Sequence, residues 1–366
     1  RVKEEQKQMK KLLIIFAVLC LAAPAMAADW NFYGSARMAT FYSIVDKDLN
    51  NDNDTVNRTQ WAQQGNARIG ATVQVNDQIG GGFEVGEDFS TRKLYGTYNF
   101  AGGSQLLLGQ TYTPSSGYFY SNSVFDGDGD LLGVGQFYTG RRAMVQWQTG
   151  GFKLAFIEPT TIDDDATRVY DLIIPKIEAN YAFKGDSWFL DAYGGFQYYS
   201  IDYFQGNDPD VTAWVVGLGG GMNFGAFYVN LGGHYAANAG AYGAYGAGFG
   251  GLTPINDDFA VDADQNEIDN SGWGALAVLG WNMNDMWTIE GGVGYEYAEL
   301  DVDGPAGDGE SVWQVYLNTT VNIAPGFFIV PEIGYASYDY AAVTVAGQDE
   351  AKPNIFYAGA KWQINF

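Results

Sequence analysis

From residue 30 to the end of the chain, apolar and polar positions alternate in a series of short stretches. The last stretch is NIFYAGAKWQINF (354–366), in which every second residue from Phe356 to Phe366 is apolar or small and most of the others are polar. A period of two residues is typical of a β-strand with one apolar and one hydrated face. The same alternation occurs at 30–42, 67–76, 93–100, 142–148, 175–183, 188–200, 272–283, 287–300, 312–323 and 327–337. Because no stretch shows a helical period, the pattern predicts a nearly all-β protein.

The connections between these stretches alternate in length. Tight polar or Gly-rich turns are expected at 76–80, 101–104, 149–151, 184–187, 223–226, 282–285 and 324–326. Longer, mostly acidic loops are expected near 44–58, 113–138, 158–169, 203–210, 236–271, 301–310 and 339–353, with a short one, STRK, at 90–93. These connections join about sixteen antiparallel strands.

Charged residues recur on the polar faces of the predicted strands. Examples are Arg37, Arg68, Lys176, Glu178, Glu290, Glu332 and Lys361. A soluble sandwich would bury these faces in a dry core, which is costly for charges. A barrel closed in lipid instead turns its apolar faces to hydrocarbon and its polar faces to a wet lumen. The sequence therefore predicts an all-β, transmembrane antiparallel β-barrel of about sixteen strands.

The N-terminal part differs from the rest of the chain. Residues 9–27, MKKLLIIFAVLCLAAPAMA, have a basic start, an apolar run and a small-residue cleavage pattern, so we expect a signal peptide. Residues 1–8 are interpreted as an upstream extension, and residues 28–366 as one barrel domain. Cys20, the one cysteine, lies in the apolar run, so no disulfide is expected in the barrel.

The charge of the expected mature chain is strongly negative. Five of the 19 basic residues and two of the 43 acidic ones precede Ala28, which leaves 14 against 41 and a net charge of −27. Such a field repels nucleic acid and concentrates cations at the surface. A channel in this chain would accordingly prefer cations.

Two segments carry a family resemblance. SQLLLGQTYTP (104–114), followed by a loop and GRRAMVQWQTGGFKLAFIEP (140–159), is similar to the fifth strand, constriction loop and following strands of porins. KWQINF, with Trp362, Ile364 and Phe366, is similar to the C-terminal signal that outer-membrane barrels present to their assembly machinery. The chain thus resembles the Gram-negative outer-membrane general-diffusion porin family.

That resemblance implies a location, a mechanism and partners. It implies a barrel in the outer membrane of a Gram-negative bacterium, with a third loop folded into the lumen, that passes small hydrophilic solutes and ions by diffusion. The implied partners are outer-membrane lipid and lipopolysaccharide, the barrel-assembly machinery and further copies of the chain in a homo-oligomer such as a trimer. No cofactor or bound metal is implied.

The expected constriction combines acidic and basic residues. Asp126, Asp128 and Asp130 of FDGDGD are spaced like calcium ligands, but the positions where an EF-hand needs Gly and Glu hold Leu131 and Phe137. The three aspartates are interpreted either as acidic groups on a loop folded into the lumen or as part of a solvated loop that binds metal loosely. Arg37, Arg68 and Arg142 could form the opposing positive wall, or pair locally with lumen carboxylates.

The remaining inward polar residues are interpreted as lumen wall. They are Lys176, Glu178, His234, Glu290, Glu332 and Lys361. His234 is the one histidine, so a Ser-His or Asp-His enzyme is conceivable, yet no further motif of a barrel enzyme accompanies it. The sequence predicts a porin rather than an enzyme, and the alternative is a barrel acting through its loops as an adhesin or envelope scaffold.

Overall fold

The structure, a computed structural model, describes most of the predicted barrel domain. The described residues are 28–46, 55–116, 120–125, 131–160, 168–172, 174–203, 208–244, 246, 248, 252, 255–262, 264, 266–303, 307–340 and 352–366. The predicted extension and signal peptide at 1–27 lie outside them, as do Asp126, Asp128 and Asp130.

Strands dominate the described chain. They are β1 (Asp29–Asp46), β2 (Thr55–Gln63), β3 (Arg68–Gln74), β4 (Ile79–Gly86), β5 (Thr91–Asn99), β6 (Ser104–Tyr112), β7 (Arg141–Thr149), β8 (Phe152–Ile157), β9 (Arg168–Asp171), β10 (Lys176–Lys184), β11 (Trp188–Tyr203), β12 (Asp210–Phe224), β13 (Phe227–Ala237), β14 (Ala260–Val261), β15 (Glu267–Ile268), β16 (Asn270–Asn282), β17 (Trp287–Leu300), β18 (Glu310–Ala324), β19 (Phe327–Asp339) and β20 (Asn354–Asn365). One short helix, α3 (Ala239–Tyr242), follows β13.

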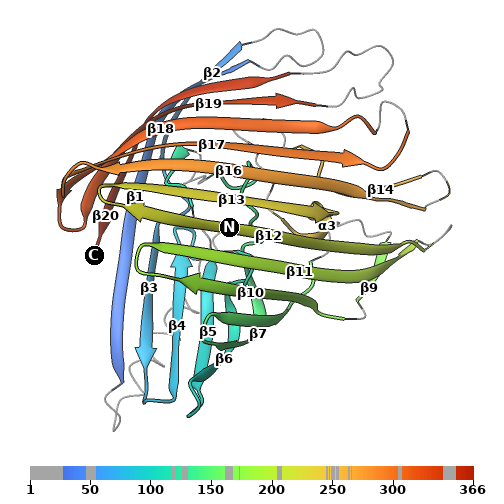
Figure 1. Ribbon diagram of the computed structural model, residues 1–366, viewed down its shortest axis with the longest axis horizontal. Helices are drawn as coiled ribbons and strands as arrows, with labels where there is room; N and C mark the ends of the chain where they lie inside the picture. The colour runs from blue at the N-terminus through green and yellow to red at the C-terminus, as the bar shows by residue number, and fades with distance from the viewer. Residues whose placement is uncertain are drawn as a thin grey trace, which may run out of the picture.

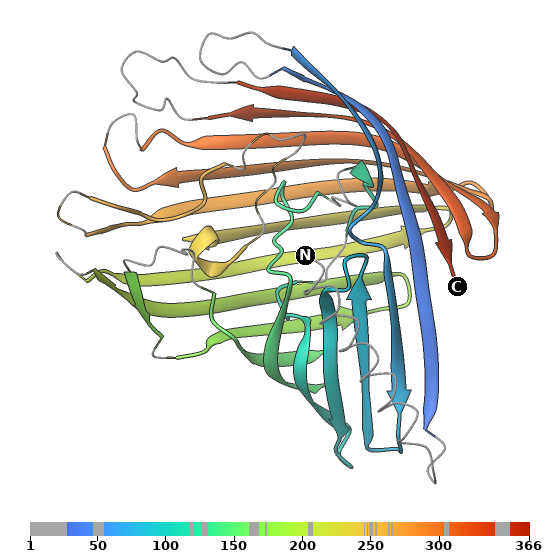
Figure 2. The same cartoon turned by 180° about the vertical axis from the view of Figure 1, so that it is seen from behind.

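The strands form a closed antiparallel barrel, seen from two sides in Figures 1 and 2. Most strands of the sheet pair with the strands next to them in sequence, and β1 closes the ring by pairing with β20. β14 and β15 pair only with each other, outside the barrel sheet. β2 and β3 both pair with β1, so together they form one interrupted span. In the same way β9 and β10 both pair with β11 and form another. Counted over the described residues, the wall has sixteen spans, as the sequence predicts.

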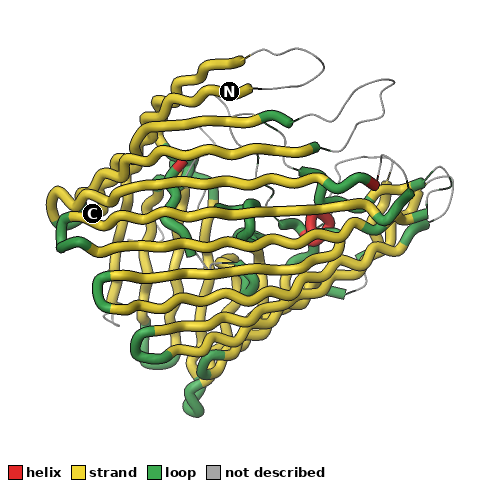
Figure 3. The backbone as a smooth tube through the Cα atoms, turned by 45° about the horizontal axis from the view of Figure 1, so that its top comes forward, coloured by secondary structure: helices red, strands yellow, loops and turns green. Residues whose placement is uncertain are grey.

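Tight turns join the strands at one end of the barrel, as Figure 3 shows. The connections between strands at the other end are mostly longer. All seven predicted tight turns are confirmed. The turn between β12 and β13 contains Gly225 with φ of 67°, and that between β18 and β19 contains Gly326 with φ of 82°. A side chain is strained at such angles, so glycine suits both turns.

The alternation along each strand separates an apolar exterior from a polar interior. Leu94 is 61% exposed on the outside of β5, while its neighbour Lys93 contacts Glu84 within the barrel. Exposed apolar side chains recur around the whole wall, which is the surface that hydrocarbon solvates. Among the described residues no helix is long and apolar enough to cross a membrane.

The last residue completes the closure of the sheet. The amide of Phe366 donates to the carbonyl of Gly34 (3.0 Å), and the Gly34 amide donates to the Phe366 carbonyl (2.7 Å). The Phe366 ring covers Gly34 and occupies the position that a Cβ there would need.

We expect Gly34→Val to impair assembly, because the new side chain displaces the Phe366 ring. Overpacking of this kind costs about 1–3 kcal/mol. The measurement is the folded fraction on unheated gels after refolding into detergent, with Ala36→Val, two residues along the same exterior face, as the control. Equal folded fractions for the two variants would contradict this account of the closure.

Candidate functional site

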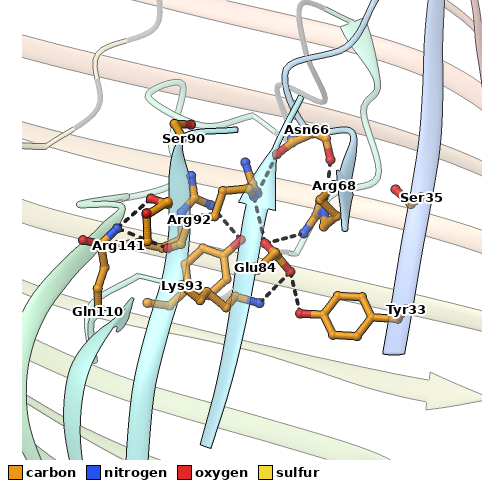
Figure 4. Close-up of polar contacts among 12 residues, drawn as sticks. Tyr33, Ser35, Asn66, Arg68, Glu84, Ser90, Arg92, Lys93, Gln110 and Arg141 are labelled. Atoms are coloured by element: carbon orange, nitrogen blue, oxygen red, sulfur yellow. Dashed lines mark hydrogen bonds and ion pairs between the residues drawn. The ribbon is translucent and has the colours of Figure 1, made fainter. Parts of the chain in front are cut away.

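A single carboxylate gathers several cations on the inner wall formed by β1 and β3–β5 (Figure 4). Glu84 on β4 forms ion pairs with Arg92 Nε (2.8 Å) and Lys93 Nζ (3.2 Å). Arg68 on β3 lies 3.6 Å from the same carboxylate, and the Tyr33 hydroxyl donates to it at 3.0 Å. We call these five residues the Glu84 cluster; it holds three cations for one anion, so its local charge is positive.

A β-bulge explains how two consecutive basic residues reach one carboxylate. Glu84 pairs with Lys93, and the next residue, Val85, pairs with Thr91, so Arg92 is the extra residue of β5. A bulge re-aims side chains that alternation would send to opposite faces. Arg92 is 7% exposed and Glu84 is 1% exposed, so this pair is well shielded from solvent.

A short loop between β4 and β5 is present, but its predicted position at 90–93 is wrong. The connection between β4 and β5 is 87–90, and Arg92 and Lys93 belong to β5. Lys93 is the first residue of the strand predicted at 93–100, whereas Arg92 lies outside the predicted strands, because the polar run STRK is typical of a loop and the bulge breaks the alternation. The unbroken alternation of 93–100 indicates that Lys93 lies in a strand, but it does not extend to Arg92.

The arginines of the predicted positive wall lie on three different strands, β1, β3 and β7. Arg68 belongs to the Glu84 cluster, and its Nε also donates to the Asn66 carbonyl (3.0 Å). Arg37 Nε donates to Ser35 on its own strand (2.7 Å), and Arg142 lies opposite Thr111 in the pairing of β6 with β7. Since Asp126, Asp128 and Asp130 lie outside the described residues, the field between the two walls stays a prediction.

An aromatic ring extends the basic region beyond Glu84. Lys93 Nζ and the guanidinium of Arg141 each lie 5.2 Å from the centre of the Tyr112 ring, and Arg141 also donates to the Tyr112 hydroxyl (3.1 Å). Cations are attracted to the face of an aromatic ring at such distances. The ring therefore helps to hold both cations at the wall.

Carboxylates on the other side of the barrel bind the connection between β6 and β7. Glu332 on β19 accepts hydrogen bonds from the amides of Val124 (2.8 Å) and Phe125 (3.3 Å). Glu290 on β17 accepts from the amide of Asn122 at 2.6 Å. Hydrogen bonds to ionised acceptors are stronger than neutral ones, so these contacts fix the middle of the connection on the wall.

Two further glutamates bind the ends of the same connection. Glu178 on β10 accepts from the Ser115 amide (2.7 Å), and Glu296 on β17 accepts from the Gly135 amide (2.9 Å). The connection is thus attached to β10, β17 and β19 through its main chain. Main-chain recognition leaves little trace in the sequence of the connection itself.

Apolar side chains pack inside the barrel beside these glutamates. Val124 and Phe125 join Phe41 of β1 and Tyr357 of β20 in one buried cluster, to which Ile255 of the β13–β16 connection also belongs. The rings of Phe125 and Tyr357 stack with centroids 3.8 Å apart. Part of the interior is consequently a protein core rather than water.

The residues assigned to a water-lined wall are accordingly buried. They are Lys176, Glu178, His234, Glu290, Glu332 and Lys361, of which His234 is the most exposed at 9%. Segments of the connections cover some of these groups, whereas Glu290 and Lys361 also line an open cavity. Lys176 Nζ, for example, donates to the Tyr242 carbonyl at 2.8 Å.

The connection between β13 and β16 also binds the inner wall. Its helix α3 ends at Tyr242, whose hydroxyl donates to Glu178 (3.0 Å), and Gln197 on β11 donates to the Ala241 carbonyl (3.1 Å). Asp257, further along the connection, lines a small cavity of about 20 Å³ with His234 and Glu296. His234 Nε2 and Glu296 lie 3.0 Å apart.

The stability of the barrel should depend on pH through Asp257. Burial, together with the neighbouring charges of Asp258 and Glu296, raises the pKa of Asp257 from 3.8 to about 7, against the opposing effect of His234. The folded protein therefore holds a proton that the unfolded chain releases, so stability is highest in acid and falls as pH rises from 3.8 to about 7. Thermal unfolding in detergent between about pH 4 and pH 7 measures the slope.

Asp257→Asn should flatten this part of the profile, because an amide does not titrate. The matched control is Asp264→Asn, an exposed aspartate of the same connection. An unchanged slope in Asp257→Asn would mean that other groups carry the dependence.

Open space remains along the inner wall despite the packed segments. A cavity of about 570 Å³ is lined by β3–β8 and includes Tyr95 and Tyr112, and one of about 510 Å³ includes Arg37, Glu290 and Lys361. The described residues contain no cluster of three or more His, Cys, Asp or Glu placed to hold a metal ion.

Comparison with known proteins identifies the architecture. No family model and no curated protein sequence matches the chain. Among solved structures, the outer membrane channel DcaP of Acinetobacter baumannii superimposes with a TM-score of 0.69 at 18% identity, over 92% of this chain and 97% of that one. The chain has the porin fold. The anion-selective porin from Comamonas acidovorans matches with a TM-score of 0.60 at 12% identity, over 93% of this chain and 100% of that one, and OmpT of Vibrio cholerae with 0.55 at 17%, over 93% and 99%.

At these identities the likeness concerns the porin fold alone. The sixteen spans, the tight turns at one end and the closure of β1 on β20 are its features here. The charges that line this porin fold have to be interpreted from the chain's own residues.

Proposed function

We propose that the chain is an outer-membrane porin, a water-filled channel for the passive diffusion of small hydrophilic solutes and ions. The observation that carries the proposal is a closed barrel with an apolar exterior and polar cavities along its inner wall. A barrel of sixteen strands is wide enough for an aqueous channel. Solutes cross it down their own gradient, so no group performs chemistry, and His234 is assigned a structural role beside Glu296.

The narrowest part is proposed to lie between the Glu84 cluster and the β6–β7 connection folded into the lumen. The four wall glutamates that bind this connection support that position. Charges of opposite sign across confined water favour polar over apolar solutes. The acidic chain as a whole favours cations at the mouths, whereas the Glu84 cluster opposes them locally, so we propose a weak cation preference.

The purified barrel should give discrete conductance steps in planar bilayers. Under a salt gradient, the sign of the reversal potential should indicate cation preference, because the net charge of the expected mature chain is −27. Anion selectivity would refute the preference but leave the channel intact. A folded protein without conductance steps would refute the channel itself.

The other proposed attributes follow from the channel. Residues 9–27 direct export, Trp362, Ile364 and Phe366 present the last strand to the assembly machinery, and lipid with lipopolysaccharide surrounds the wall. We further propose a homo-oligomer such as a trimer, to be measured by mass determination in detergent.

A loop-based role as adhesin or envelope scaffold is the alternative. The apolar clusters that fill part of the lumen favour it, since a fully packed barrel would conduct nothing. The same bilayer experiment decides, because this alternative requires a folded barrel with no current.

A further inference from the structure

A row of polar side chains crosses five neighbouring strands of the inner wall, away from the Glu84 cluster. Strand register places Asn99 opposite Gln105, and Gln105 opposite Gln148. Gln148 in turn lies opposite Lys153, and Lys153 opposite Asn180. The row therefore offers amide donors and acceptors on β5, β6, β7 and β10, with one ammonium group on β8.

A cavity of about 860 Å³ opens at the Lys153 end of this row. Its lining includes Lys153, Lys184 and Asp191, and it is bounded as well by Tyr120 of the β6–β7 connection and Phe189 of β11. The Tyr120 and Phe189 rings stack with centroids 6.0 Å apart. The volume lies within the range of small-molecule sites, and a few placed polar groups in such a space determine which solute fits.

The three charges in this cavity are not paired with one another. Within the described part of the chain, no ion pair of 4.0 Å or less joins Lys153, Lys184 or Asp191. Lys184 and Asp191 are diagonal neighbours across β10 and β11, a relation that places the two residues about 7–8 Å apart. Asp191 is only 7% exposed. A nearly buried carboxylate and two lysines thus line one cavity without a direct ion pair among them, although the carboxylate and the lysines attract one another across it.

These charges favour one kind of solute. A simple anion would bind the lysines but be repelled by Asp191. A simple cation would bind Asp191 but be repelled by the lysines. A solute that carries an ammonium and a carboxylate group on the same carbon atom satisfies Asp191 and the lysines at once. Gln148 and Asn180 line the same cavity, and their amides can bind a polar side chain. We propose that this cavity binds zwitterionic α-amino acids on their way through the channel, carboxylate toward Lys153 and Lys184, ammonium toward Asp191.

This inference rests on the proposed channel function, so its test keeps the two separate. Proteoliposome swelling compares L-glutamine with arabinose, a neutral sugar of nearly equal mass, and potassium chloride conductance reports the open channel. We expect glutamine to enter faster than arabinose in the wild type. Asp191→Asn and Lys153→Gln should each reduce the ratio of the two rates about two- to fivefold, the value of one partly exposed charge pair, with conductance retained.

Asp285→Asn is the matched control, because it removes the same charge at the same end of the barrel in the turn after β16. It should leave the ratio unchanged. Equal entry of glutamine and arabinose into wild-type vesicles would overturn the inference, as would a ratio insensitive to both cavity variants. If the wild-type protein shows no potassium chloride conductance, the proposed channel function is overturned instead.

Discussion

Glu332→Ala is expected to increase single-channel conductance and to destabilise the barrel. Besides the amides of Val124 and Phe125, the Glu332 carboxylate accepts hydrogen bonds from Ser123 Oγ (2.9 Å) and Tyr357 Oη (3.1 Å). Each buried donor left without a partner costs about 1–3 kcal/mol, so we expect a loss of about 3 kcal/mol or more. The β6–β7 connection would lose its attachment to β19 and leave a wider passage.

The measurements are single-channel recording and urea unfolding in detergent. Glu332→Gln tests the charge, because the amide keeps one acceptor oxygen and should show a smaller change. Glu299→Ala on β17 is the control, since this glutamate is exposed and accepts from Tyr297 of its own strand. Wild-type conductance in Glu332→Ala would show that the connection does not narrow the pore.

Glu84→Gln should destabilise the barrel by about 3 kcal/mol, because it leaves Arg92 buried without its counter-charge. It should also shift the reversal potential toward anions, since Arg68, Arg92 and Lys93 would then face the lumen with no carboxylate among them. Unfolding in urea measures the first effect, and bilayer recording under a salt gradient measures the second.

Glu87→Gln provides the comparison for Glu84→Gln. Glu87 is exposed in the connection between β4 and β5, three residues along the chain, and its loss changes the net charge equally. An equal shift of the reversal potential in both variants would mean that overall charge, rather than the Glu84 cluster, sets selectivity.

The strands were predictable because each span exposes one face to an apolar and one to a polar environment. Alternation from Phe356 to Phe366 therefore identified β20, and tight turns such as 223–226 identified the hairpins. Where backbone geometry breaks the period, the prediction failed: the extra residue Arg92 in β5 made a strand look like a loop.

The interior was less predictable than the wall. Alternation indicates that Glu178 and Glu332 point inward, but not what lies beside them. Their partners include main-chain amides of residues 63 and 208 positions distant, and an amide is present at every residue except proline. The inward orientation of the glutamates was predictable from the sequence, but the β6–β7 connection that covers them was not.

The pairing of β1 with β20 also constrains the order of assembly. It joins Ser35–Asp46 to Asn354–Asn365 over twelve consecutive positions, so partners more than 300 residues apart must meet. Until β20 pairs with β1 and β19, the facing edges of these strands carry unpaired amides and carbonyls, which can pair with strands of other chains. The last strand to be synthesised is thus the one that removes both exposed edges of the sheet.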